Sequence, residues 1–252
     1  PVTDENEMLT MIHKVYAYYD NVSSEPLKLL TMAYYPWSNS DRNGPERCLI
    51  HRGVRTIQSA AEGRAVSDLH AIDGPGHYES VTELWSRTVP EVLFVLSWAS
   101  NKNNVGYLFY GGAWTPLQLS TTHTPLVCAA TCLSADYVTT QAYDDQYPIC
   151  ERMLFDSIEK GPVMYVGPAT ASYQVGNNAF LDKYVDRLLA NPAVPAAESF
   201  MLAQRDVLVE YAGNSRICET VKAYAFLGDP VSRVMNSRHR PTSVEDHQVH
   251  KA

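Results

Sequence analysis

The sequence predicts an α/β fold in which a mainly parallel sheet carries helices on both faces. Short runs of continuous apolar residues recur along the 252-residue chain, and such runs are typical of strands covered on two faces. Stretches with helical spacing lie between these runs, which predicts parallel strands joined by crossover helices. The length and the hydrophobic fraction of 45% allow a substantial buried core.

The first elements predicted are a helix and a buried strand. Residues 4–19 carry apolar side chains at helical spacing behind an acidic start, which suits the positive end of a helix dipole. The apolar run from Leu27 to Tyr35 is flanked by prolines and predicts a strand. Turn-forming residues from Ser38 to Cys48 predict a surface loop, and residues 57–69 predict a helix.

The middle of the chain predicts one helix followed by three strands. Residues 77–88 have a helical pattern. The apolar runs Val92–Trp98, Val105–Tyr110 and Thr124–Cys132 each have the continuous apolarity of a doubly covered strand.

The last third predicts a fourth strand among helices. An amphipathic helix over residues 150–161 leads into a strand at Gly161–Gly167. Three further helical patterns follow at residues 178–190, 199–212 and 215–223. Residues 236–252 lack apolar content, so we expect a domain over residues 1–235 followed by a flexible polar tail or linker.

Composition excludes several classes of protein. The net charge is −8 and the basic residues are scattered, which argues against nucleic acid as a partner. No apolar run approaches the roughly 20 residues of a membrane span. The five cysteines show no paired spacing typical of a metal site. No strand is followed by a glycine-rich nucleotide motif, so we expect no cofactor.

Candidate site residues follow two of the predicted strands, where parallel strands end at one edge of the sheet. Gly111 and Gly112 come after one strand, and glycines let a ligand approach the backbone closely. Cys132 is the last residue of the next predicted strand. A thiol there, facing a histidine from a neighbouring strand end, is how a Cys/His dyad is assembled. The alternative is that Cys132 is a small buried hydrophobic residue, as Cys128 inside the strand is expected to be.

Four segments of the chain occur in the order PVTDENEMLTMIHKVYAYY, TPLVCAATCLSADY, ICERMLFDSIEKGPVMYVGPATASY and AYAFLGDPVSRV. In this order they resemble the gingipain-type cysteine peptidase family of the caspase and legumain group. The resemblance implies a caspase-haemoglobinase-like fold and an extracellular or cell-surface location. It also implies Cys132 as the nucleophile, with main-chain amides at Gly111 and Gly112 receiving the oxyanion.

The sequence departs from this family at the catalytic histidine. The family shows Gly-His-Gly after the preceding strand, whereas Gly112 or a neighbour occupies that place here. His123 lies at the opposite end of the Cys132 strand, about 25 Å away at about 3.3 Å per residue. His77 and His70 are the other candidates for a base, and both lie in the part of the chain that matches the family poorly.

Two functions therefore compete. The first is a non-catalytic binding or assembly subunit that keeps the peptidase fold. The alternative is an active cysteine endopeptidase that uses Cys132 with an unidentified histidine. The expected partner is a polypeptide substrate or a protein, and a companion chain or further domain is expected to complete the sheet.

Overall fold

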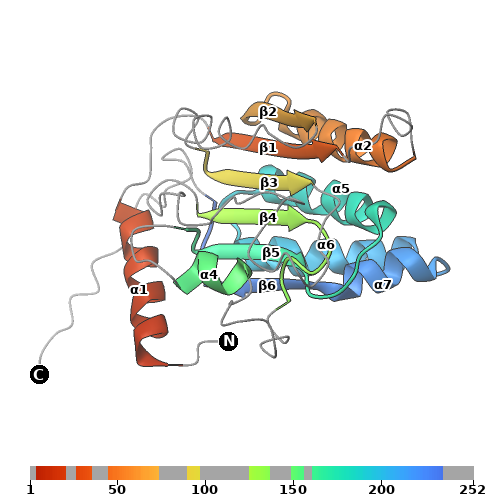
Figure 1. The fold of residues 1–252 in the computed structure, drawn as a ribbon. Helices are drawn as coiled ribbons and strands as arrows, with labels where there is room; N and C mark the ends of the chain where they lie inside the picture. Colours follow the sequence, from red (N-terminus) through yellow and green to blue (C-terminus); the bar gives the residue numbers. More distant parts are fainter. Residues whose placement is uncertain are drawn as a thin grey trace, which may run out of the picture.

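A computed structural model describes residues 4–20, 27–35, 45–73, 90–96, 125–136, 149–155 and 161–234. They form one sheet with helices on both of its faces (Figure 1). The strands are β1 (Lys28–Tyr35), β2 (Val66–Asp73), β3 (Val92–Leu96), β4 (Leu126–Ala130), β5 (Met164–Pro168) and β6 (Tyr224–Gly228). The helices are α1 (Glu5–Asp20), α2 (Pro45–Ala61), α4 (Ile149–Phe155), α5 (Gln174–Ala190), α6 (Ala196–Glu210) and α7 (Ser215–Ala223).

The sheet is mainly parallel, as predicted. The strand order is β2-β1-β3-β4-β5-β6, and every neighbouring pair is parallel except β5 and β6. All residues of β3, β4 and β5 are buried, which explains why these strands are apolar without alternation. The carboxyl ends of the parallel strands lie at the same end of the sheet, where ligand sites of such folds are found.

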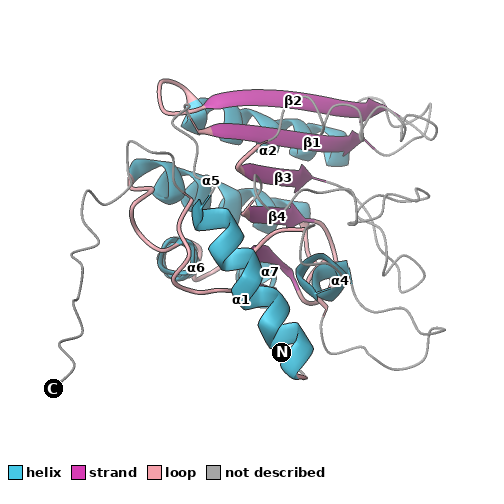
Figure 2. Ribbon diagram, turned by 90° about the vertical axis from the view of Figure 1, so that its left-hand side faces the viewer, coloured by secondary structure: helices cyan, strands magenta, loops and turns pink. Residues whose placement is uncertain are grey.

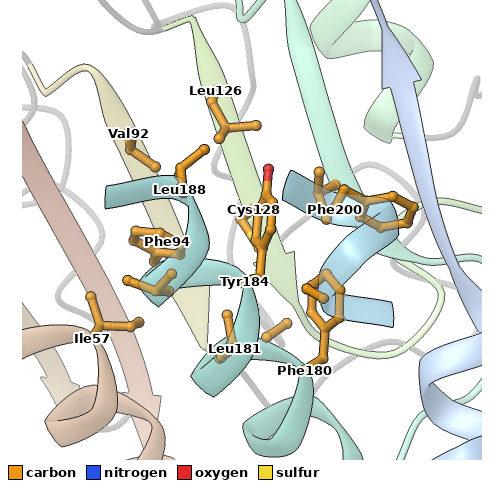
Figure 3. Close-up of a cluster of buried hydrophobic side chains, with 14 of the residues drawn as sticks. Ile57, Val92, Phe94, Leu126, Cys128, Phe180, Leu181, Tyr184, Leu188 and Phe200 are labelled. Carbon is orange, nitrogen blue, oxygen red and sulfur yellow. The ribbon is translucent and has the colours of Figure 1, made fainter. Parts of the chain in front are cut away.

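Alternate residues of β1, β3, β4, β5 and β6 contribute to two separate cores, one on each face. On one face, α2, α5, α6 and α7 cover Phe94 and Cys128 (Figure 3). On the other face, α1 and α4 cover Leu93, Val127 and Tyr165. Figure 2 shows α1 and α4 on the face of the sheet opposite α2 and α5. The prediction of helices on both faces is therefore confirmed.

Two predicted elements are wrong in part. The helix predicted over residues 57–69 ends at Ala61, and β2 starts at Val66. Gly63, with φ +70, terminates the helix because a left-handed conformation there costs glycine little. The loop predicted over residues 38–48 is helical from Pro45, the first residue of α2, where a proline loses no helical hydrogen bond.

β6, a short strand that directly follows α7, was not predicted from the sequence. The predicted strand Val105–Tyr110, the predicted helix over residues 77–88 and the predicted tail over residues 236–252 lie outside the described residues. None of the helices in the described ranges combines the length and apolarity that crossing a membrane requires.

Candidate functional site

Cys132 lies on the turn that follows β4, at the carboxyl end of the parallel strands. The strand before it is completely buried, and Cys132 is half-buried. Thr131 is buried as well, so Cys132 is the first residue after the strand that is partly exposed. This location is the one that the sequence predicts for a reactive thiol in a parallel sheet.

The turn is held against the segment that follows β5. The amide of Leu133 donates to the Thr170 carbonyl at 3.1 Å, and the amide of Ala135 donates to the Pro168 carbonyl at 3.0 Å. Leu133 has a φ of +56, which is uncommon for a residue with a side chain. Such a conformation costs about 1–3 kcal/mol and persists where surrounding contacts hold it. The residue directly after Cys132 thus stores local strain.

Ser172, also in the segment after β5, surrounds the sulfur of Cys132 with three polar groups. The Cys132 Sγ donates to the Ser172 carbonyl at 3.3 Å. The amide of Ser172 donates to Sγ at 3.4 Å, and its hydroxyl donates at 3.7 Å. A thiol uses the carbonyl as its acceptor, whereas a thiolate uses the amide and the hydroxyl as donors. Both ionisation states of the sulfur therefore have a partner in one residue.

Ser172 was not among the predicted site residues. The available signal was the loop of small residues, Ala169–Ser172, that directly follows the β5 strand. Because β5 is the parallel neighbour of β4, its carboxyl end lies beside that of β4. Ser172, four residues beyond the end of β5, is therefore within reach of Cys132.

A buried polar chain supports this end of the sheet. Asn177, in the first turn of α5, is 2% exposed. Its Nδ2 donates to the Ala130 carbonyl at 3.5 Å, and its Oδ1 accepts from the Tyr224 hydroxyl at 3.0 Å. The amide of Tyr173 donates to Thr220 Oγ1 at 2.9 Å. The strand end, α5 and α7 are thereby tied together next to Cys132.

Other thiols have a different environment. Cys128 is fully buried within β4, and this burial raises the pKa of its thiol well above the usual range. Burial, with a smaller contribution from Glu151, raises the pKa of Cys150 to about 12. Both are thiols of the core, as expected for Cys128. Cys132 differs from them in exposure and in its polar contacts.

The other predicted site residues, His77, Gly111 and Gly112, lie outside the described residues, as does His123. His70 lies on β2 and is aligned with Ala129 of β4 through the registers of β1 and β3. Three strand spacings of about 4.8 Å separate the two backbones by about 14 Å. The strand of His70 is thus separated from the strand that precedes Cys132 by β1 and β3. Within the described ranges, no group of three or more His, Cys, Asp and Glu side chains is arranged to hold a metal ion.

Comparison with known proteins gives one family and several solved structures. The family model described as peptidase family C25 matches residues 1–235. The crystal structure of the Arg specific cysteine proteinase gingipain R is similar, with a TM-score of 0.70 and 12% identity over 92% of this chain and 54% of that chain. No curated protein matches the chain.

Two complexes have the same fold in one of their chains. The complex of the pro- and mature domains of RgpB from Porphyromonas gingivalis has a TM-score of 0.67 and 12% identity, over 91% of this chain and 54% of that chain. The separase-securin complex of Saccharomyces cerevisiae has a TM-score of 0.55 and 9% identity, over 87% of this chain and 13% of that chain. The chain thus spans about half the length of the gingipain chains that it matches.

Proposed function

The chain belongs to peptidase family C25, and on this basis we propose that it binds extended polypeptide at the Cys132 turn with little or no endopeptidase activity. The observation that carries this proposal is in the sequence, where Gly112 or a neighbour stands at the position of the histidine in the family's Gly-His-Gly. General-base assistance contributes about 10² to 10⁴-fold to rates, and activation of a thiol nucleophile depends on the same imidazole. Its loss leaves a site that binds without turnover.

The fold supports a binding role that does not need catalysis. The Cys132 turn and the segment Ala169–Ser172 lie side by side at the carboxyl ends of β4 and β5. Hydrogen bonds and the buried Asn177 hold both segments in place. A preorganised site of this kind binds an extended chain without the entropic cost of ordering its own loops.

The second candidate is an active cysteine endopeptidase, and the contacts between Ser172 and Cys132 favour it. In that reaction Cys132 attacks the substrate carbonyl, and the main-chain amides at Gly111 and Gly112 receive the oxyanion. His77 would be the base that takes the thiol proton and returns it to the leaving amine.

Digestion of a broad peptide library separates the two candidates. The wild type and Cys132→Ala are expected to give equal, negligible cleavage. Cys218→Ala is the matched control, because Cys218 is also half-buried and its Sγ donates to the Tyr211 carbonyl at 3.1 Å. Cleavage that persists in Cys218→Ala and disappears in Cys132→Ala would overturn the proposal in favour of the endopeptidase. Gain of cleavage in Gly112→His would show that the rest of the site is intact.

Thiol labelling under native conditions tests the site itself. Cys132 is expected to react well before Cys128, because only Cys132 is accessible at the strand end. Cys48 is exposed and would react as well, so the measurement uses a Cys48→Ser background. Protection of Cys132 by library peptides, read by mass spectrometry, would locate the bound peptide at this turn. The reverse order of labelling would contradict the position assigned to Cys132.

The family suggests the setting in which this binding takes place. We place the protein at the cell surface or outside the cell, with a protein or a polypeptide as its partner. A complex of pro- and mature domains is among the similar structures, and it supports a protein partner. We assign the peptidase-like domain to residues 1–235, the span of the family match, and residues 236–252 to a polar tail or linker.

A further inference from the structure

Helix α1 buries a lysine and exposes apolar side chains. Lys14 is completely buried, whereas Met8, Ile12 and Tyr16 are 48%, 43% and 67% exposed. These three residues are spaced by four and form one stripe along the helix. A free surface helix has the opposite arrangement, with its charged residues facing solvent.

Lys14 fixes the orientation of α1. Its Nζ donates to the carbonyls of Met153 and Leu154, at 2.9 and 2.8 Å, at the end of α4. These carbonyls are among those that a helix leaves without internal partners, and a cation there also suits the helix dipole. The stripe of Met8, Ile12 and Tyr16 therefore faces outward because Lys14 is anchored on the opposite side.

The stripe forms one wall of an apolar groove of about 700 Å³. Phe155 of α4, Leu227 of β6 and Val231 complete the groove, and Val231 is itself 66% exposed. Apolar side chains gathered at one exposed place mark a binding surface more often than single exposed residues do.

The groove runs beside an open edge of the sheet. β6 is the last strand in the order, and its outer edge has no strand partner among the described residues. Proteins usually protect such edges with charged side chains or proline. β2, at the opposite edge, carries Asp68 and Asp73, whereas Tyr224–Gly228 contains neither a charge nor a proline. At the start of β6 the Tyr224 carbonyl accepts from Gln204 Nε2 at 3.2 Å. The groove lies beside the rest of the strand, Phe226–Gly228.

The polar residues of the groove are acidic. Glu151 and Asp229 line it. Partial burial, together with the nearby Glu7, raises the pKa of the Glu151 carboxyl. A carboxylate in such surroundings is stabilised by a cation from a partner.

We propose that an extended, mainly apolar polypeptide segment carrying lysine or arginine adds to β6 as a further strand. Its backbone would pair with the outer edge of β6, and its side chains would enter the groove beside α1. Gly228 pairs with Met164 at the start of β5, so the groove lies at the end of the sheet opposite Cys132. The inference does not rest on the function proposed for the Cys132 turn.

The probe is a fluorescein-labelled, eight-residue peptide of alternating valine and threonine with lysine at both ends. A peptide with glutamate at both ends is its control. Fluorescence anisotropy is expected to show saturable binding of the lysine peptide to the full chain and weaker binding of the glutamate peptide. Glu151→Gln is expected to reduce the difference in affinity between the lysine peptide and the glutamate peptide. Equal affinity for the two peptides, or no binding of either, would overturn the proposal.

Two matched variants test the location. Ile12→Ser changes the groove, and Val209→Ser changes an apolar residue on α6 that is 74% exposed. Ile12→Ser is expected to weaken binding about tenfold and Val209→Ser to leave it unchanged. Thermal unfolding of both variants shows whether they fold like the wild type. Equal effects of the two substitutions would show that the peptide does not bind in the groove.

Hydrogen exchange tests strand addition directly. The amides of β6 are expected to exchange more slowly with the lysine peptide bound, while those of β2 stay unchanged. If the bound peptide slows exchange elsewhere in the chain but not at the amides of β6, the proposed pairing of the peptide with β6 is wrong. A dimer of the free chain that Ile12→Ser dissociates in sedimentation would instead place a second copy in the groove. Binding to neutral phosphatidylcholine vesicles that Ile12→Ser abolishes would place a lipid surface there.

Discussion

Replacing Gly167 with alanine is expected to disturb the Cys132 turn through Ser134. A Cβ at position 167 would lie 2.3 Å from Ser134 Oγ, 3.1 Å from the Ala129 carbonyl oxygen and 3.2 Å from Tyr165 Cε1. Ser134 is 3% exposed, and its hydroxyl donates to the Ala129 carbonyl at 3.0 Å. The hydroxyl must therefore rotate away and give up this bond.

The free energy of unfolding is expected to fall by about 3 kcal/mol, from the lost buried hydrogen bond and the overpacking together. Urea denaturation of Gly167→Ala, Ser134→Ala and the double variant measures it. Ser134→Ala removes the nearest atom, so the double variant should lose clearly less stability than the sum of the two single variants. Gly213→Ala is the control, since a Cβ there meets no atom within 4 Å. Additive effects of the two substitutions would refute the steric argument.

Substitutions at three further sites address the strain, the buried lysine and an ion pair. Leu133→Gly should keep the free energy of unfolding within about 1 kcal/mol of the wild type. Leu133→Val should lower it by about 1–2 kcal/mol, because a β-branched residue tolerates a positive φ poorly. Thermal unfolding compares the two variants, and equal stabilities would speak against strain at this position. Lys14→Met leaves two carbonyls at the end of α4 without their cation, so it should lower the free energy of unfolding by about 3 kcal/mol in urea denaturation. The control, Lys222→Met at an exposed position, should lower it by at most about 0.5 kcal/mol. A small loss in both variants would show that Lys14 does not anchor α1. Arg187 donates to Asp206 and lowers the pKa of that carboxyl, so the stability this pair contributes is fully present above about pH 4 and is lost as the pH falls through the lowered folded-state pKa. The difference in stability between the wild type and Asp206→Asn should therefore shrink below about pH 4, and a difference that does not depend on pH would contradict this assignment.

The central strands could be predicted because burial on both faces leaves a simple signal in the sequence. β3, β4 and β5 are entirely buried, and their continuous apolarity has no other common cause at that length. The edge strands lack this signal. β2 mixes Asp68 and His70 with apolar residues and follows a helix closely, so its spacing was read as helical. β6 follows α7 without a turn, so nothing in the sequence separates its short apolar run from the helix.

The candidate site could be predicted only as far as one strand. Cys132 was identified because it ends a buried strand, and the carboxyl ends of parallel strands face the same edge. Ser172 was not, because its proximity depends on β5 being the neighbour of β4, and the chain order of strands does not reveal their order in the sheet. The groove beside α1 was also missed. In the sequence, the apolar residues of α1 have the spacing of a helix face packed against the core. The stripe of Met8, Ile12 and Tyr16 faces outward because Lys14 is anchored to α4.

The separation of β5 from β6 in the chain has a consequence for synthesis. These strands are neighbours in the sheet, but α5, α6 and α7 lie between them in the sequence. When β5 leaves the ribosome, the sheet face that carries Phe94 and Cys128 still lacks the cover of α5, because that helix has not been made. At about 5–20 residues per second, the three helices and β6 need several seconds more. During this interval the nascent chain presents an apolar sheet face to chaperones, and slower translation of residues 169–223 would prolong that exposure.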